Sequence, residues 1–301
     1  FTPIQNPATA VAALLSGDVD MIDPVPIQDA ARLSQDPNVE VIQGIEARVI
    51  MLGMAQQAET LKYGDEGAPN PFLDVRVRTA VAHAVNVDAI LQTIMRGNAE
   101  PASQLVSPAM RGFSADLAAR PAYDVEGAKA LLAEAGYADG FSFGLKCPND
   151  RYLNDEAVCQ AVVSMLAQIG LTAELDAMPV RNYWPELRED NFDMYLLGWS
   201  PGTFDAEHPI RFLAHTPSEN LGTWNFGDFS NARVDELLPQ IQAELDEATR
   251  QAMLDEATGI LQSEMAYVPM YVQPLVWGTR NNITLTQRPD NFFILRWVTV
   301  N

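Results

Sequence analysis

The sequence is poor in histidine, cysteine and basic residues. Its 301 residues include only 3 His and 2 Cys, and 19 Lys and Arg stand against 40 Asp and Glu. The net charge of −21 repels phosphate backbones and anionic lipid surfaces, so we expect no nucleic-acid partner. The His and Cys residues show no C-x-x-C or H-E-x-x-H spacing. The sequence therefore predicts no metal site and no bound cofactor.

Long apolar runs are also absent. None approaches the roughly 20 residues that cross a bilayer, and the first residues lack the basic and apolar regions of a signal peptide. The opening stretch is instead typical of a domain interior: Asn6 can cap a helix, Pro7 suits its first turn and Gly17 its exit, and a short strand follows at 19–22. We interpret the chain as an internal fragment or a processed product.

The two cysteines, Cys147 and Cys159, are predicted at a strand end and in the second turn of the next helix. A disulfide can bridge that distance. We favour a disulfide, which requires an oxidising compartment; the alternative is two free, buried thiols.

Helices and strands alternate from residue 124 onward. The apolar spacing predicts helices at 124–137, 154–170 and 181–190, and strands at 141–147, 171–178 and 192–199. The last strand is apolar along its length and is predicted to be buried on both faces. Repeated strand–helix–strand units indicate an α/β fold with a largely parallel sheet.

The flanking segments follow other patterns. Residues 74–97 predict two helices broken near Asn86, and 231–265 a long helical stretch broken near Pro239. Residues 266–285 turn to strands, whose prolines suggest sheet edges or crossovers.

A serine motif lies at the end of the apolar strand. Gly198-Trp199-Ser200-Pro201-Gly202 matches the G-x-S-x-G pattern of a hydrolase, and His208 and His215 follow closely. In such enzymes the residue after the serine donates its backbone N–H to the oxyanion, but here it is proline, which has none. The motif therefore favours a loop that binds a ligand over a reactive serine.

The loops after strands 141–147 and 192–199 are the predicted ligand site. In open α/β sheets, ligands bind beyond the carboxyl ends of the strands. An arginine, a carboxylate and several aromatic rings suit a zwitterionic ligand with apolar side chains, although aromatic residues at strand ends are also commonly core. The predicted ligand-binding residues are Asn149, Arg151, Tyr152, Trp199, Thr203, Phe204, Asp205 and Trp224.

Several stretches carry a family resemblance in the family's order. They are "NPATAVAALLSGDVDMI", "NPFLDVRVRTAVAHAVNVDAIL", "DVEGAKALLAEAGY" and the helix–strand series that ends in "GW". Together they resemble the periplasmic dipeptide/oligopeptide-binding proteins of ABC importers, family 5 of the extracellular solute-binding proteins. The resemblance implies a type II periplasmic-binding-protein fold and a monomeric, periplasmic binder rather than an enzyme. Its two lobes would close around a solute by hinge motion and present it to a membrane permease.

The resemblance also implies that the chain is the C-terminal portion of a longer protein. Residues 1–23 would then be the end of a first-lobe segment and its crossover, 24–268 the second lobe, and 269–301 the crossover back with a C-terminal first-lobe segment.

The resemblance assigns roles to individual residues. Arg151 matches the arginine that pairs with the peptide carboxylate in dipeptide-binding relatives, as a bidentate hydrogen bond favours. The aspartate that holds the peptide amino terminus is replaced by Gly202, while Asp205 matches a second acidic position. Either Asp205 substitutes for the missing carboxylate, or the ligand has no free amino terminus.

Two further functions compete with solute binding. One is a serine hydrolase that uses Ser200, and the other is a chaperone-like interaction protein on the same fold. The sequence favours solute binding and leaves the solute open among peptides, modified peptides, opines and oligosaccharides.

Overall fold

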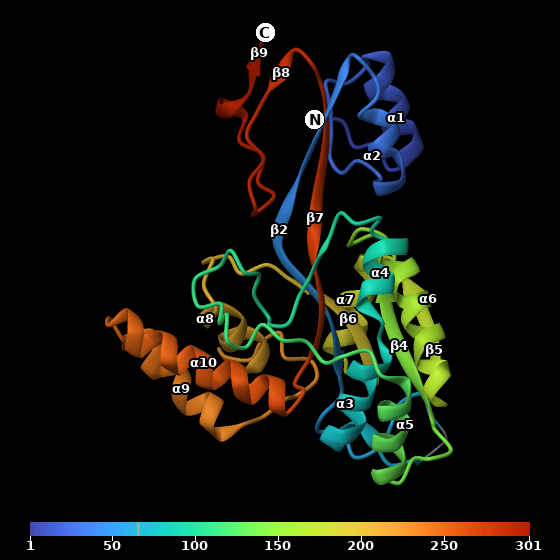
Figure 1. Ribbon diagram of the computed structural model, residues 1–301, viewed down its shortest axis with the longest axis vertical. Helices are drawn as coiled ribbons and strands as arrows, with labels where there is room; N and C mark the ends of the chain where they lie inside the picture. Colours follow the sequence, from blue (N-terminus) through green and yellow to red (C-terminus); the bar gives the residue numbers. More distant parts are fainter. Residues whose placement is uncertain (65–66) are drawn as a thin grey trace.

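The structure is a computed structural model that describes residues 1–64 and 67–301. It is elongated, with a smaller body at one end and a larger body at the other (Figure 1). Two long strands, β2 (Val39–Met54) and β7 (Val268–Arg280), run through both bodies side by side. Both chain termini lie at the smaller body (Figure 1).

The smaller body gathers both ends of the chain. It contains α1 (Pro7–Ser16), β1 (Met21–Ile22), α2 (Ile27–Leu33), β8 (Ile283–Thr284), a 3₁₀ turn (Leu295–Trp297) and β9 (Thr299–Val300). As the sequence predicts, Asn6 caps α1 by accepting a hydrogen bond from Thr9 N at 3.0 Å, and Gly17 ends it with φ +83°. The predicted strand at 19–22 is shorter than expected.

One mixed sheet spans both bodies, in the order β1-β7-β2-β6-β4-β5, and the short β3 (Glu100–Pro101) also pairs with β7. The strands β4 (Ser142–Pro148), β5 (Thr172–Met178) and β6 (Met194–Trp199) are parallel, as predicted. The expectation of a largely parallel sheet is wrong for the rest, because β2 pairs antiparallel with both β6 and β7. The reason is that β2 leaves the smaller body and β7 returns to it, so they run in opposite directions.

Helices cover both faces of the larger body. One face carries a 3₁₀ turn (Pro71–Leu73), α3 (Val75–Ala84), α4 (Val87–Thr93), α5 (Val125–Glu134), α6 (Asp155–Leu166) and a 3₁₀ turn (Ala167–Ile169). The other carries α7 (Val180–Arg188), α8 (Glu207–Pro209), a π-helical turn (Ile210–Ala214), α9 (Ala232–Ala243) and α10 (Glu247–Ser263). Alternate β6 residues enter the two cores, Met194 and Leu196 one, Tyr195 and Leu197 the other. This explains why the whole strand is apolar.

One sequence expectation about prolines is wrong, and of the edge or crossover expected for 266–285 the structure shows the crossover. The helical stretch 231–265 breaks at 244–246, where Asp246 caps α10, and Pro239 lies inside α9. Pro269 and Pro274 lie in β7, which has neighbours on both sides rather than an open edge. Both prolines sit beside shifts in the β2–β7 register, where the regular hydrogen-bond ladder is interrupted.

The core of the smaller body contains residues from both sides of the expected lobe boundary at 23/24. Val25, Ala30 and Leu33 pack with Val11 and Leu14 in the core of the smaller body. We therefore propose that the chain changes lobe inside β2 and inside β7, rather than at residues 24 and 268.

Candidate functional site

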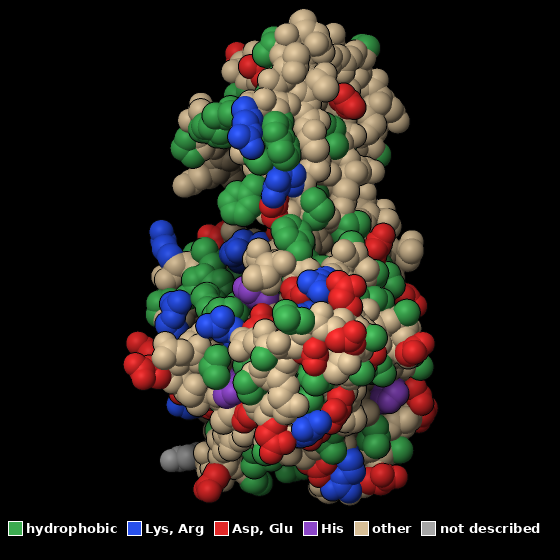
Figure 2. All heavy atoms as spheres, turned by 90° about the vertical axis from the view of Figure 1, so that its left-hand side faces the viewer, with side chains coloured by type: hydrophobic (Ala, Val, Ile, Leu, Met, Phe, Trp, Pro, Cys, Tyr) green, Lys and Arg blue, Asp and Glu red, His purple; other side chains and the backbone are tan. Residues whose placement is uncertain are grey.

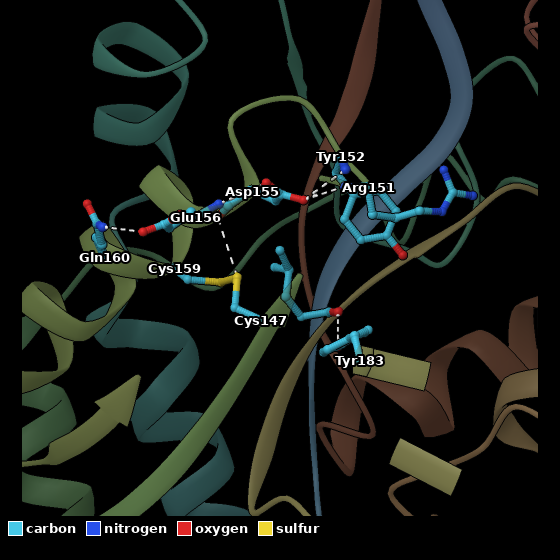
Figure 3. The surroundings of a disulfide bond; sticks show 9 residues. Cys147, Arg151, Tyr152, Asp155, Glu156, Cys159, Gln160 and Tyr183 are labelled. Carbon is cyan, nitrogen blue, oxygen red and sulfur yellow. Dashed lines mark hydrogen bonds between the residues drawn. A yellow bond between two sulfur atoms is a disulfide. The ribbon is translucent and has the colours of Figure 1, made fainter. Parts of the chain in front are cut away.

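The loop that carries Arg151 follows β4 and leads into α6. Its base is closed by the disulfide between Cys147 and Cys159 (Figure 3). Asp155 Oδ2 accepts hydrogen bonds from the backbone N–H groups of Arg151 and Tyr152, each at 2.9 Å. Burial raises the pKa of the Asp155 carboxyl, and these hydrogen bonds oppose the rise. The loop is thus held at both ends, while the Arg151 side chain extends away from the disulfide and is exposed (Figure 3).

Tyr152 connects this loop to the end of β6. Its hydroxyl donates to Gly198 O at 3.4 Å, and burial raises its pKa, so the hydroxyl keeps its proton. A Cβ at Gly198 would lie 2.6 Å from Tyr152 Cε1, so only glycine allows this approach. The guanidinium carbons of Arg151 and Arg48 lie 5.2 and 5.8 Å from the centre of the Tyr152 ring.

A buried polar network lies beside Tyr152, where β2 and β7 pass between the bodies. The Glu46 carboxylate is buried, pairs with Arg48 Nη2 at 2.7 Å and accepts from Gln273 Nε2 at 2.6 Å. Gln273 Oε1 in turn accepts from Leu153 N at 3.3 Å. The network ties both crossover strands to the loop after Arg151. The sequence alone predicts no strand at 39–54 and therefore does not predict this network.

An aromatic cluster lies at the end of β6. The Trp199 ring centre is 5.6 Å from that of Trp224 and 5.8 Å from that of Phe212, and all three side chains are half-buried. Trp199 Nε1 donates to His208 Nδ1 at 3.2 Å. Burial, with the nearby Arg211 charge adding to it, lowers the pKa of His208. His208 therefore accepts this hydrogen bond as a neutral imidazole.

The Asp205 carboxylate is already engaged. Oδ1 lies 2.8 Å from Arg250 Nη2 and accepts from Glu207 N at 2.9 Å, while Oδ2 lies 4.0 Å from Arg111 Nε. It shares the edge with Arg151, because β4 and β6 are parallel, but its charge is balanced within the chain.

The other predicted site residues lie in the same loops. Asn149 and Thr203 are exposed, and Asn149 N donates to Met178 O at 3.0 Å. Phe204 is half-buried, with φ +54°, and packs against one of the cores of the larger body. The structure thus brings Arg151 into contact with Tyr152, and Trp199 with Trp224, and it turns the Asp205 carboxylate toward α10.

The serine motif forms no catalytic arrangement within residues 1–64 and 67–301. There, Ser200 has no hydrogen bond to His208 or His215; His208 Nδ1 accepts from Trp199, and His215 Nδ1 lies 2.7 Å from Thr216 O. The described residues also contain no group of three or more His, Cys, Asp or Glu side chains that could hold a metal ion. No helix among them is both long and apolar enough to cross a membrane.

Comparison with known proteins finds both sequence relatives and similar solved structures. The glutathione-binding protein GsiB of Shigella dysenteriae serotype 1 is 28% identical over 291 residues, which cover 94% of this chain and 54% of the relative. AgaA of A. tumefaciens R10, solved with agropinic acid, superposes with a TM-score of 0.80 at 26% identity, over 93% of this chain and 55% of that one. DppA of Helicobacter pylori, solved with the peptide STSA, gives 0.86 at 21% identity, over 99% and 56%.

The chain therefore spans about half the length of the curated relatives that it matches. The profile of the bacterial extracellular solute-binding proteins, family 5, matches residues 1–220, which is well over half of the chain. The chain belongs to the bacterial extracellular solute-binding proteins of family 5.

Proposed function

We propose that the protein is the solute-binding component of an ABC importer and captures a peptide or peptide-like solute at the carboxyl edge of β4 and β6. The observation that carries the proposal is the convergence on this edge of an exposed arginine, Arg151, with the aromatic rings of Tyr152, Trp199 and Trp224. A guanidinium pairs with a carboxylate, and the half-buried rings of Trp199 and Trp224 can cover apolar side chains, which is the chemistry of a peptide.

The surroundings support a site of fixed shape. Arg151 and Tyr152 are anchored through Asp155 and the disulfide, and the crossover strands reach the same loop through Gln273. Closure of a second lobe over this edge would bury the solute, with β2 and β7 as the segments that bend. The named ligands of the relatives, glutathione for GsiB, the peptide STSA for DppA and agropinic acid for AgaA, favour a peptide-like solute here too.

The proposal extends to setting and partners. The protein works outside the cytoplasmic membrane, in keeping with its disulfide, and delivers its solute as a monomer to permease subunits. It is not an enzyme, so a fluorophosphonate probe should leave Ser200 unlabelled. Stoichiometric labelling at Ser200, abolished by Ser200→Ala, would revive the hydrolase alternative.

Thermal unfolding with a panel of solutes tests the binding function. The protein, expressed at its full encoded length, is heated with di- to pentapeptides, each free and N-acetylated. A ligand at 100 times its Kd stabilises the native state by about 2.7 kcal/mol, which raises the unfolding midpoint measurably.

A matched pair of arginine variants locates the site. Arg151→Gln should lower the rise in midpoint, because loss of one charge-assisted contact weakens binding about tenfold. Arg233→Gln should preserve the rise, since Arg233 lies on α9 and pairs with Glu256. If no peptide raises the midpoint, the peptide function is wrong; if Arg151→Gln binds like the wild type, the site is wrong.

A further inference from the structure

Two arginines at the ligand edge have no carboxylate partner, although the chain as a whole is acidic. The chain carries a net charge of −21, yet Arg151 and Arg211 both lie at this edge. Among residues 1–64 and 67–301, no Asp or Glu oxygen lies within 4.0 Å of either guanidinium. Figure 2 shows a hollow between the two bodies with Lys and Arg side chains beside it, whereas Asp and Glu predominate further down the same face.

The two guanidiniums are held by aromatic rings instead of carboxylates. Arg151 lies on the Tyr152 ring, and the Arg211 guanidinium carbon lies 5.2 Å from the centre of the Phe212 ring. Arg211 Nε is also buried without a hydrogen-bond partner in the described part of the chain. Leaving a buried charged donor unsatisfied is costly; Arg211 as a whole is only half-buried, so a ligand acceptor would meet the accessible part of its side chain rather than Nε.

The rings that carry the two arginines lie at the same edge of the sheet, on opposite faces of β6. Tyr152 contacts Gly198 through its hydroxyl, the next residue is Trp199, and the Trp199 ring contacts the Phe212 ring that lies under Arg211. A bound molecule must therefore extend across the end of β6 to reach both guanidiniums.

The carboxylates near this edge are already satisfied from within the chain. Asp205 pairs with Arg250, Glu46 with Arg48, and Asp155 accepts backbone N–H groups. Two more carboxylates accept hydrogen bonds: Glu207 Oε1 from Gln242 Nε2 at 2.5 Å, and Asp150 Oδ1 from Val180 N at 2.6 Å. The edge therefore offers a ligand two arginines without an ion pair, while Asp205, the carboxylate considered as an ammonium anchor, is already paired with Arg250.

We propose that the solute carries at least two acidic groups, one for Arg151 and one for Arg211, and needs no free ammonium group. This inference rests on the proposed solute-binding function and names the class of its ligand: acidic peptides and peptide-like di- or polycarboxylates. Of the two roles considered for Asp205, it selects the one in which no ammonium anchor exists.

Calorimetric titration of the full-length protein with three dipeptides tests the inference. Glu-Glu and Gln-Gln have nearly the same shape and differ in charge, and N-acetyl-Glu-Glu lacks the ammonium group. Each charge-assisted contact that is lost should cost about tenfold in Kd, so Glu-Glu should bind at least tenfold more tightly than Gln-Gln. N-acetyl-Glu-Glu should match Glu-Glu, and added salt should weaken the acidic peptides most.

Arginine variants assign the two contacts. Arg211→Gln should weaken Glu-Glu about tenfold and change Gln-Gln little, whereas Arg151→Gln should weaken both, because Gln-Gln keeps its C-terminal carboxylate. Arg211→Lys should restore part of the loss, which separates lost charge from misfolding, and Arg233→Gln on α9 should change neither Kd.

The outcomes separate this inference from the function on which it rests. If Gln-Gln binds as tightly as Glu-Glu, or if neutral peptides bind while Glu-Glu does not, the acidic class is wrong and solute binding stands. If acetylation abolishes binding, an ammonium anchor exists. If no peptide of either kind binds, both the inference and the proposed function fail.

Discussion

Asp205 and Arg250 form an ion pair that joins the loop after β6 to helix α10. Oδ1 lies 2.8 Å from Nη2, and both side chains are only 14% exposed. A carboxylate so placed is part of the structure of the loop. Its charge is balanced by Arg250 and is not available to the ammonium group of a ligand.

Asp205→Ala should therefore act on stability. Removing one partner of a largely buried pair leaves the other charge unsatisfied, and we expect the free energy of unfolding to fall by about 3 kcal/mol. Urea denaturation measures this, with Asp29→Ala as control, since its pair with Arg32 is more exposed and should contribute less than about 1 kcal/mol. Unchanged stability with selective loss of free-amine peptides would instead identify Asp205 as the ammonium anchor.

The disulfide should stabilise both the fold and the site. Cys147 and Cys159 are 12 residues apart and enclose Arg151 and Tyr152. Closing a loop of this size contributes about 3 kcal/mol, so the double alanine variant should unfold at lower urea and bind its solute more weakly. A reducing agent should reproduce this loss in the wild type and leave the double variant unaffected. A wild type indifferent to reduction would show that the bond contributes nothing.

Gly198→Ala should disturb the packing of the Tyr152 ring against β6. The added Cβ would lie 2.6 Å from Tyr152 Cε1 and 2.7 Å from Ile50 Cδ1, both buried, so something must move. Overpacking of this kind costs about 1 to 3 kcal/mol. The matched control is Gly259→Ala in α10, where the new Cβ meets nothing within 4 Å and alanine should raise helix stability by about 1 kcal/mol. Equal effects of the two substitutions in chemical denaturation would contradict the close approach.

Acidification should weaken the aromatic cluster through His208. Its pKa is lowered from 6.5 by burial, so the folded state favours the neutral imidazole that accepts from Trp199. The corresponding stability is fully present above pH 6.5 and is lost as the pH falls through the lowered pKa of the folded state. We expect His208→Gln to flatten the pH dependence of the unfolding free energy below pH 6.5, and His83→Gln to retain it. Identical pH profiles for the wild type and His208→Gln would refute this role.

Much of the fold follows from local sequence signals. Asn6 and Asp124 are caps that a reader can find without a structure, and the uniformly apolar run of β6 predicts burial on both faces. The carboxyl ends of β4 and β6 likewise place Arg151 and Trp199 at one edge, because parallel strands end together.

The remainder depends on contacts between distant segments. Strand β2 has no regular alternation, since its first half is partly exposed and its second half is buried on both faces. Its neighbours, β6 and β7, lie far along the chain, so neither the strand nor the Glu46 network has a local signal. The ion pair of Asp205 has no local sequence signal either, because Arg250 lies on α10, 45 residues further along the chain.

Hydrogen–deuterium exchange of the full-length protein, with and without the panel peptide that most raises its unfolding midpoint, tests the central claim most directly. The account predicts slower exchange in two segments, 149–154 and 199–212, with a smaller effect in the middle of β2 and β7. Protection confined to other segments, such as α9 and α10, would place the solute elsewhere and contradict the site described above.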